Sequence, residues 1–256
     1  MAKNFSVKKV GAIIIGDEIL SGKREDKHFG KLISLLAVRQ MELNWSICLP
    51  DEPKLISDVF KSTIAKDDIT FCFGGIGATP DDHTRQCVAT ATNTELELHP
   101  EAKKEIESVF GSDAYPNRII MGHFPKGANI IPNPYNRIPG FSIGTNYFLP
   151  GFPVMAWPMI EWVLDNLHLD QQHLIKKDSN SIIVVGAGES HLIELMRDFE
   201  KEFPVYKIFS LPTISKGERR IELGVKGDSK GLKEALDFIK RGVSRLGFSW
   251  KNNVKS

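Results

Sequence analysis

Residues 71–85 read Phe-Cys-Phe-Gly-Gly-Ile-Gly-Ala-Thr-Pro-Asp-Asp-His-Thr-Arg, and this stretch decides the fold. The segment that leads into the glycines, residues 68–73, is β-branched and aromatic, a composition typical of a buried strand. From Thr84 onward the sequence is compatible with a helix. The glycines therefore fall on a turn that joins a strand to a helix.

A glycine turn in this position suits a phosphate group. Gly74, Gly75 and Gly77 allow positive φ angles and a close approach of the backbone to a ligand. The first N–H groups of the following helix lack helical partners, and they favour an anion. The turn therefore predicts a phosphate-binding site.

Asp81 and Asp82 follow the glycines directly. Carboxylates repel phosphate unless a cation lies between them, so the pair predicts Mg²⁺ or a similar hard divalent cation that bridges the protein and a phosphorylated ligand. The alternative interpretation is that the glycines only form a tight turn and that an Asp caps the helix.

Strand and helix patterns alternate through the first half of the chain. Strands are expected over residues 9–15, 45–49 and 69–73, and the helix after the first strand has an apolar face formed by Phe29, Leu32, Ile33 and Leu36. Such alternation predicts an α/β fold with a mainly parallel sheet and helices on both faces, in three layers. Ligands bind beyond the carboxyl ends of parallel strands, so Asp17 and the glycine turn are expected to share one pocket.

Composition excludes several classes of function. The chain has 256 residues with 33 basic and 32 acidic side chains, a balance that argues against a dedicated nucleic-acid or membrane binder. No apolar stretch has the length of a membrane span, and we expect no signal peptide. The three cysteines are scattered without metal-ligand spacing, which favours reduced thiols in a cytoplasmic protein.

Two domains are expected. Residues 170–180 are polar and form the best candidate linker, so we place an α/β domain over residues 1–170 and a small α+β domain over residues 178–250. In the second domain we expect strands at 181–185, 205–210 and 219–226 and helices at 189–203 and 229–246. Its basic residues alternate with acidic ones, so we expect it to bind no nucleic acid.

Three motifs carry a resemblance to a known family. They are residues 15–22 with Asp26, residues 74–85, and residues 149–151, which read Ile-Gly-Asp-Glu-Ile-Leu-Ser-Gly, Gly-Gly-Ile-Gly-Ala-Thr-Pro-Asp-Asp-His-Thr-Arg and Leu-Pro-Gly. The chain resembles the molybdopterin-binding (MoCF) family, and within it the N-terminal part of the competence/damage-inducible protein A family. The second domain, with Gly-Ala-Gly-Glu-Ser at 186–190, resembles the small second domain of that family. The amidohydrolase domain that ends longer relatives is expected to be absent.

The resemblance implies an activity and a set of site residues. It implies a metal-dependent nucleotide pyrophosphatase, a hydrolase acting on phosphoric anhydrides such as an ADP-ribose-like dinucleotide. Asp26 and Asp82 are then the catalytic residues, and Asp17, Asp81 and Asp82 hold the divalent metal, Mg²⁺ or a similar ion. The residues expected to bind the ligand are Gly16, Ser21, Gly74, Gly75, Gly77, Thr79, Thr84, Pro150 and Gly151.

Two other functions stay open. One is a protein of molybdenum-cofactor biosynthesis that binds molybdopterin and transfers an adenylyl group. The other is a non-catalytic module that binds a nucleotide or a pterin. In each case the partner is a phosphorylated small molecule, a dinucleotide or a pterin, and the intact carboxylates disfavour the non-catalytic module.

The sequence departs from the family pattern at four positions. His28 and His83 stand where Asn and Leu are usual, which leaves their roles as base, metal ligand or packed residue open. Asn136 and Ile138 replace a glycine and an alanine in a passage that faces the substrate in the family. Aromatic residues near the end of the first domain, Phe152, Trp157 and Trp162, predict either a homo-oligomer or a cover over the sheet within one subunit.

Overall fold

The computed structural model describes residues 7–172, 177–215 and 218–253. The chain divides into two compact units, Met1–Leu174 and Ile175–Ser256, and each is described by itself. In the described residues, no helix is long and apolar enough to cross a lipid bilayer.

The first unit is built on a six-stranded, mainly parallel sheet. Its strands are β1 (Val10–Ile15), β2 (Leu43–Leu49), β3 (Ile69–Phe73), β6 (Asn129–Ile131), β7 (Gly140–Ile143) and β8 (Asn146–Leu149). They lie in the order β2-β1-β3-β8-β7-β6. The first four strands are parallel to one another, and β7 pairs antiparallel with both β8 and β6. This confirms the predicted α/β fold with a mainly parallel sheet.

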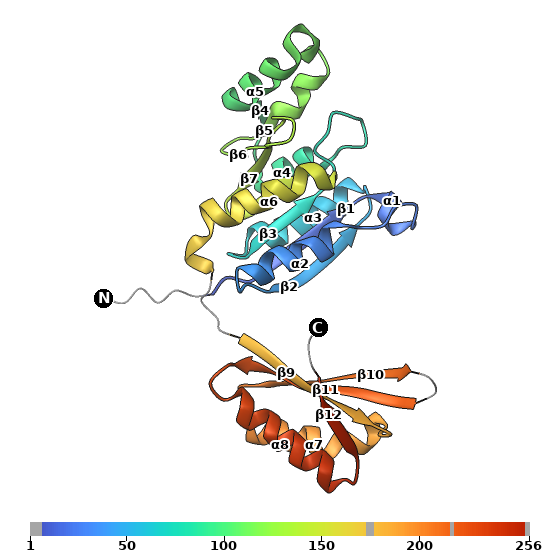
Figure 1. Ribbon diagram of the computed structural model, residues 1–256. Coiled ribbons are helices and arrows are strands. Elements are labelled where there is room, and N and C mark those ends of the chain that lie inside the picture. Colours follow the sequence, from blue (N-terminus) through green and yellow to red (C-terminus); the bar gives the residue numbers. More distant parts are fainter. Residues whose placement is uncertain (1–6, 173–176, 216–217, 254–256) are drawn as a thin grey trace, which may run out of the picture. The chain divides into compact units, whose positions relative to one another are not determined.

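Helices cover both faces of this sheet. Helices α2 (His28–Val38) and α6 (Pro153–Leu167) pack on the face that includes Ala12 and Phe71, and they lie on the near side of the sheet in Figure 1. Helices α3 (Pro53–Ile64) and α4 (Thr84–Thr92) pack on the face that includes Ile13 and Cys72. Because neighbouring residues of β1 point to opposite faces, all six residues of this strand are buried.

The apolar face of α2 differs from the predicted one. Leu32 and Leu36 are buried as expected, but Leu35 joins them in place of Phe29 and Ile33, which are 42% and 41% exposed. The predicted and the observed apolar faces share residues 32 and 36. Contact of the helix with the sheet buries the face that also includes Leu35.

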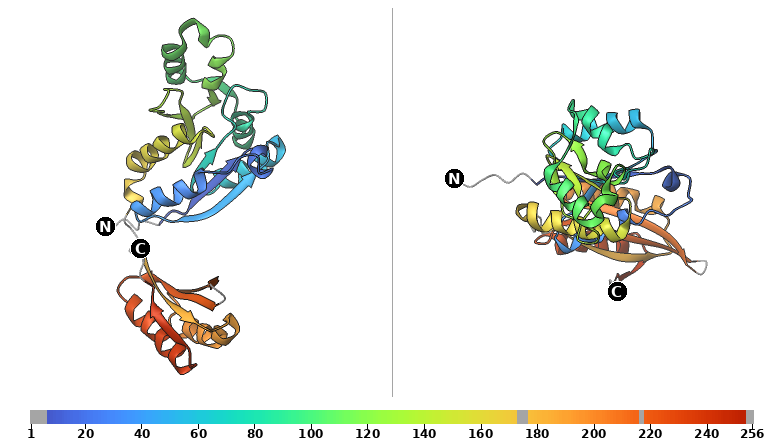
Figure 2. Two further views of the ribbon diagram at one scale, coloured as in Figure 1. Left: turned by 45° about the vertical axis from the view of Figure 1, so that its right-hand side comes forward. Right: turned by 90° about the horizontal axis from the view of Figure 1, so that it is seen from above.

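A small extension follows α4. The strands β4 (Leu96–Leu98) and β5 (His123–Pro125) pair antiparallel, and between them lie α5 (Pro100–Phe110) and the 3-10 helices η1 (Gly111–Ala114) and η2 (Arg118–Gly122). In Figure 1 and the left view of Figure 2, α5 lies at the end of the unit away from β2. The extension therefore stands beside the β6–β7 edge of the sheet.

The second unit is a four-stranded antiparallel sheet with two helices on one face. The strands lie in the order β10-β11-β9-β12, with bounds β9 (Lys177–Val185), β10 (Lys207–Ser215), β11 (Glu218–Asp228) and β12 (Ser249–Asn252). Helices α7 (Glu189–Glu202) and α8 (Leu232–Arg245) bury their apolar faces against this sheet. Two expectations were wrong: residues 177–180 of the predicted linker belong to β9, and β12 was not foreseen.

Candidate functional site

A cavity of about 470 Å³ opens at the carboxyl ends of the parallel strands. Much of its lining comes from the segments that follow four strands: Gly16 and Glu18 after β1, Asp51 after β2, residues 74–79 after β3, and residues 150–152 after β8. The two predicted motifs thus meet in one pocket, as the topology of a parallel sheet requires.

The glycine turn is held to α4 through its carbonyl groups. Thr84 donates its hydroxyl to the Gly74 carbonyl at 2.9 Å and its N–H to the Gly75 carbonyl at 3.0 Å. Arg85 donates to the Gly77 carbonyl. Gly74 and Gly75 have φ angles of +102° and +69°, which only glycine adopts readily.

This anchoring leaves the N–H groups of the turn free. Across a trans peptide the C=O of one residue and the N–H of the next point in opposite directions, so carbonyls held by α4 turn N–H groups away from it. In the part of the chain that the structure describes, the N–H groups of Gly75, Ile76, Gly77 and Ala78 donate to no protein acceptor. Consecutive free N–H groups in a cavity form an anion-binding nest.

Asp82 closes the turn. Its Oδ2 accepts hydrogen bonds from the Thr79 N–H at 2.9 Å and the Thr79 hydroxyl at 2.5 Å. Asp81 beside it is exposed, and the proximity of the Thr79 hydroxyl lowers the pKa of its carboxyl. Both carboxylates line the cavity, so Asp82 shapes the turn and also contributes charge to the pocket.

Asp51 is a pocket carboxylate that sequence reasoning missed. It exchanges hydrogen bonds with Asp17: the Asp17 N–H donates to Asp51 Oδ2 at 2.9 Å, and the Asp51 N–H donates to Asp17 Oδ1 at 3.3 Å. Burial raises the pKa of Asp51, and the negative charges of Asp17, Glu18 and Asp81 add to this effect. Asp51 lies two residues after the end of β2. The rule that ligands bind beyond the carboxyl ends of parallel strands, which was applied to Asp17, therefore also points to Asp51.

The predicted metal ligands are only partly brought together. Asp81 and Asp82 line the cavity with Glu18 and Asp51, whereas Asp17 lies just outside its lining. Within the described residues, no three His, Cys, Asp or Glu side chains are arranged to hold a metal ion. The oxygen donors fit a hard divalent cation, which would take the rest of its coordination from phosphate and water. The metal remains a prediction.

Two further predicted residues of the first motif, besides Asp17, lie outside the cavity lining. Asp26 caps α2, because its two carboxylate oxygens accept the N–H groups of His28 at 3.0 Å and Phe29 at 2.9 Å. Ser21 ends the short helix α1 (Asp17–Leu20). Thr84 also stays outside the lining, where it anchors the turn. Their roles in catalysis and ligand binding remain predictions.

One wall of the cavity is apolar. It consists of Phe110, Met121, Ile138, Phe152 and Met155. The first two come from the extension that follows α4, which sequence reasoning did not connect with the site. Such a wall suits a flat ring system.

Asn136, one of the departures from the family pattern, orders the loop that contributes Ile138 to this wall. Its Oδ1 accepts hydrogen bonds from the Asn133 side chain at 2.8 Å and from the Ile138 N–H at 3.0 Å. Its Nδ2 lies 3.6 Å from Met155 Sδ. The asparagine thus connects the loop at 133–138 to helix α6.

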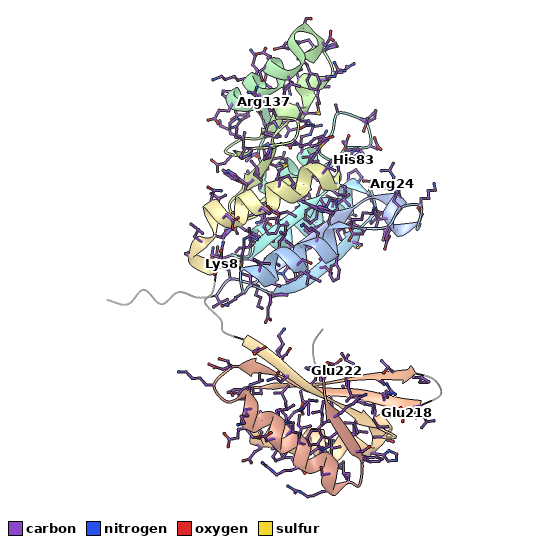
Figure 3. The ribbon with its side chains drawn as sticks, viewed as in Figure 1. Lys8, Arg24, His83, Arg137, Glu218 and Glu222 are labelled. Atoms are coloured by element: carbon purple, nitrogen blue, oxygen red, sulfur yellow. The ribbon has the colours of Figure 1, made fainter. Side chains whose placement is uncertain are left out.

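The histidines have separate positions. His28 is buried, stacks on Phe73 with ring centroids 4.4 Å apart, and contacts the Gly151 carbonyl through Nε2 at 3.0 Å. Burial lowers its pKa. His83 precedes α4 and is labelled in Figure 3. His28 therefore supports the Pro150–Gly151 wall from behind, and neither histidine lines the cavity.

Arg24 is the single cation in the lining of this cavity as the described residues define it. Lys8, which precedes β1, marks the other end of the sheet in Figure 3. Arg24 is exposed and lies beside α1 in the same view. Its guanidinium has no carboxylate within ion-pair distance among the described side chains, so it is available to a bound anion.

The parallel sheet, the glycine turn and the carboxylates at the strand ends define an α/β domain of the molybdopterin-binding type. Residues 11–169 match the family model described as "Probable molybdopterin binding domain". This match covers more than half of the chain, and the chain belongs to that family.

Two relatives extend the likeness. The chain is 30% identical over 193 residues to a protein of Caldivirga maquilingensis, a match that covers 73% of this chain and 74% of that protein. It is 30% identical over 244 residues to a putative competence-damage inducible protein of Clostridium kluyveri, a match that covers 89% of this chain and 56% of the relative. The chain thus spans about half the length of that relative.

A solved structure supports the fold of the first unit. CinA of Thermoplasma acidophilum, a protein of unknown function, superposes with a TM-score of 0.57 at 23% identity. The superposition covers 62% of this chain and 98% of that one.

Proposed function

We propose that the first unit is a metal-dependent nucleotide pyrophosphatase, whose substrate is an ADP-ribose-like dinucleotide. The observation that carries the proposal is the set of four free N–H groups at residues 75–78, in a turn that lines the cavity together with carboxylates. Free N–H groups bind the oxygens of a phosphate, and carboxylates near a phosphate require a cation.

The remaining walls fit the rest of such a substrate. Phe110, Met121 and Met155 offer an apolar surface to a nucleobase, and Arg24 offers a guanidinium to a second phosphate. The cavity volume, about 470 Å³, is in the range of small-molecule sites.

The residues support an in-line hydrolysis. Water adds to one phosphorus, the bond from that phosphorus to the bridging oxygen breaks, and two phosphate monoesters form. Asp51 is suited to accept the proton of the water, because its pKa is raised. Asp81 and Asp82 line the same cavity as the turn and would hold a divalent cation, which would neutralise phosphate charge and polarise a phosphoryl oxygen.

A second candidate function uses the same pocket. The family match over residues 11–169 favours a pterin phosphate as ligand, with transfer of an adenylyl group instead of hydrolysis. The apolar wall and the N–H groups fit a pterin phosphate as they fit a nucleotide.

A substrate screen separates these functions. The full chain is incubated with ADP-ribose, with NAD or with a pterin phosphate and ATP, each with Mg²⁺, Mn²⁺ or Co²⁺, and the products are resolved by chromatography. We expect AMP and ribose 5-phosphate from ADP-ribose only when metal is present. An adenylylated pterin without dinucleotide hydrolysis supports the second function. Binding without any product supports a non-catalytic module.

We also propose a homo-oligomer. Phe152 and Val154, at the start of α6, are 59% and 56% exposed, a basis for contact with a second copy. Trp157 and Trp162 instead pack against the core of the first unit. Light scattering at micromolar concentration tests this proposal, and a monomer mass contradicts it.

A further inference from the structure

Arg85 is the largest of the fully buried side chains in the described part of the protein, with only 2% of its surface exposed. It is the second residue of α4, directly after the glycine turn and its two carboxylates. A charged side chain in this position needs an explanation, because arginine is almost never fully buried without a charged partner.

The guanidinium joins two segments that line the cavity. Nη2 donates to the Gly77 carbonyl in the glycine turn, and Nη1 donates to the Ile120 carbonyl in η2. Ile120 precedes Met121, which belongs to the apolar wall. Arg85 thus ties the glycine turn to the segment that carries Met121 of the apolar wall.

The positive charge of Arg85 is not balanced by an ion pair. No carboxylate in the described segments lies within ion-pair distance of it, and its Nε, also buried, has no hydrogen-bond partner. Burial lowers the pKa of Arg85, and the charge of Asp82 opposes this effect. Arginine nevertheless stays protonated in proteins, so a cation without an ion-pair partner among the described side chains lies next to the turn.

From this geometry we infer that Arg85 is a positioning residue for the anion site, and that the phosphate of the ligand supplies its missing counter-charge. By holding the Gly77 carbonyl, Arg85 directs the Ala78 N–H to the opposite side of their shared peptide, away from α4. Its charge attracts the phosphate through a protein interior in which electrostatic interactions are strong. The inference rests on the proposed function and extends it to a residue outside the cavity lining.

A charge effect and a loss of packing have different consequences. Removing a buried cation weakens the binding of an anion and strengthens the binding of a cation at the same pocket, since Asp82 then loses a neighbouring positive charge. Disorder of the turn weakens the binding of the anion and of the cation alike. The sign of the change in cation affinity therefore separates the two roles.

The test uses calorimetry on the full chain with AMP as the anionic probe and Mn²⁺ as the cationic probe. In Arg85→Met we expect AMP to bind at least about tenfold more weakly and Mn²⁺ to bind more tightly. Arg85→Lys retains the charge but not the pair of hydrogen bonds to the Gly77 and Ile120 carbonyls, so its AMP affinity should lie between those of the wild type and Arg85→Met. The control is Arg39→Met, which removes an arginine paired with Asp165 on the surface and changes neither affinity.

A second measurement does not depend on a folded Met variant. In the ¹⁵N spectrum of the wild-type protein, the Nε–H signal of Arg85 shifts when AMP is added and that of Arg39 does not. Any of three results overturns the role of Arg85. They are an unchanged AMP affinity in a folded Arg85→Met protein, a fall in the affinities for AMP and Mn²⁺ together, and an Arg85 Nε–H signal that does not shift when AMP is added. If wild-type protein binds neither AMP nor ADP-ribose, the proposed function itself fails, and the inference fails with it.

Discussion

Thr84 Oγ1 lies 2.4 Å from the position that a Cβ atom on Gly75 would occupy. The hydroxyl is fixed there by its hydrogen bond to the Gly74 carbonyl. Residue 75 therefore has to be glycine for two separate reasons, its φ angle of +69° and the lack of space for a side chain.

We predict that Gly75→Ala destabilises the first unit and abolishes phosphate binding. Gly22 has a similar φ of +71°, but a Cβ atom added there would meet no atom within 4 Å, so Gly22→Ala is the matched control. The control measures the cost of the backbone conformation alone, about 1 kcal/mol. Urea unfolding should give a larger loss for Gly75→Ala, and equal losses would show that Thr84 moves away freely.

We predict that Asp82→Asn removes turnover with little loss of stability. The amide oxygen of Asn can still accept hydrogen bonds from Thr79, while the charge that faces the cation is lost. Turnover should fall by at least about 100-fold. Asp113→Asn, at an exposed aspartate outside the cavity lining, should keep full turnover. Full activity in Asp82→Asn would contradict the carboxylate-metal mechanism.

Two substitutions separate the capping role of Asp26 from its proposed catalytic role. Asp26→Ala removes the cap of α2 and should cost about 1 kcal/mol of unfolding free energy, whereas Asp26→Asn keeps a good cap and should cost little. The catalytic role proposed from the family predicts a loss of turnover in Asp26→Asn as well. Wild-type kinetics in that variant would leave Asp26 with its capping role alone.

We predict that the first unit loses stability in acid through His168. Burial lowers the pKa of this histidine to about 4 from its usual 6.5, and its Nε2 contacts the Tyr147 hydroxyl at 2.7 Å. The unfolded chain therefore binds a proton more readily than the folded one. Stability should fall as the pH decreases from about 6.5 to about 4, by up to about 3 kcal/mol.

The variant His168→Gln isolates this contribution. Burial also lowers the pKa of His28, which acts in the same direction, so only the difference between wild type and variant is diagnostic. Urea unfolding across the pH range should give a flatter profile for the variant. Parallel profiles would mean that His168 titrates alike in both states.

The sequence predicted the fold and one side of the site because both depend on local patterns. Alternating strands and helices determine a parallel sheet, and residues that follow parallel strands meet at one edge, as Gly16 and the glycine turn do. Asp51 was accessible to the same rule.

Other features depend on long-range packing. Phe110 reaches the cavity only because the extension after α4 folds back onto the turn, and no local pattern encodes that contact. Arg85 was overlooked because a charged residue on a helix is usually exposed, whereas its burial here follows from the carbonyls of Gly77 and Ile120.

The cavity lining extends along the sequence from Ile15 to Met155, and this has a consequence for synthesis on the ribosome. A nascent chain that has formed β1, β2 and β3 contains the glycine turn but lacks the Pro150–Gly151 wall and α6. Ligand cannot assist the early stages of folding, because the pocket exists only after the whole first unit has left the exit tunnel. A ligand that needs this complete lining can therefore stabilise only the finished domain and cannot serve as a template for its assembly.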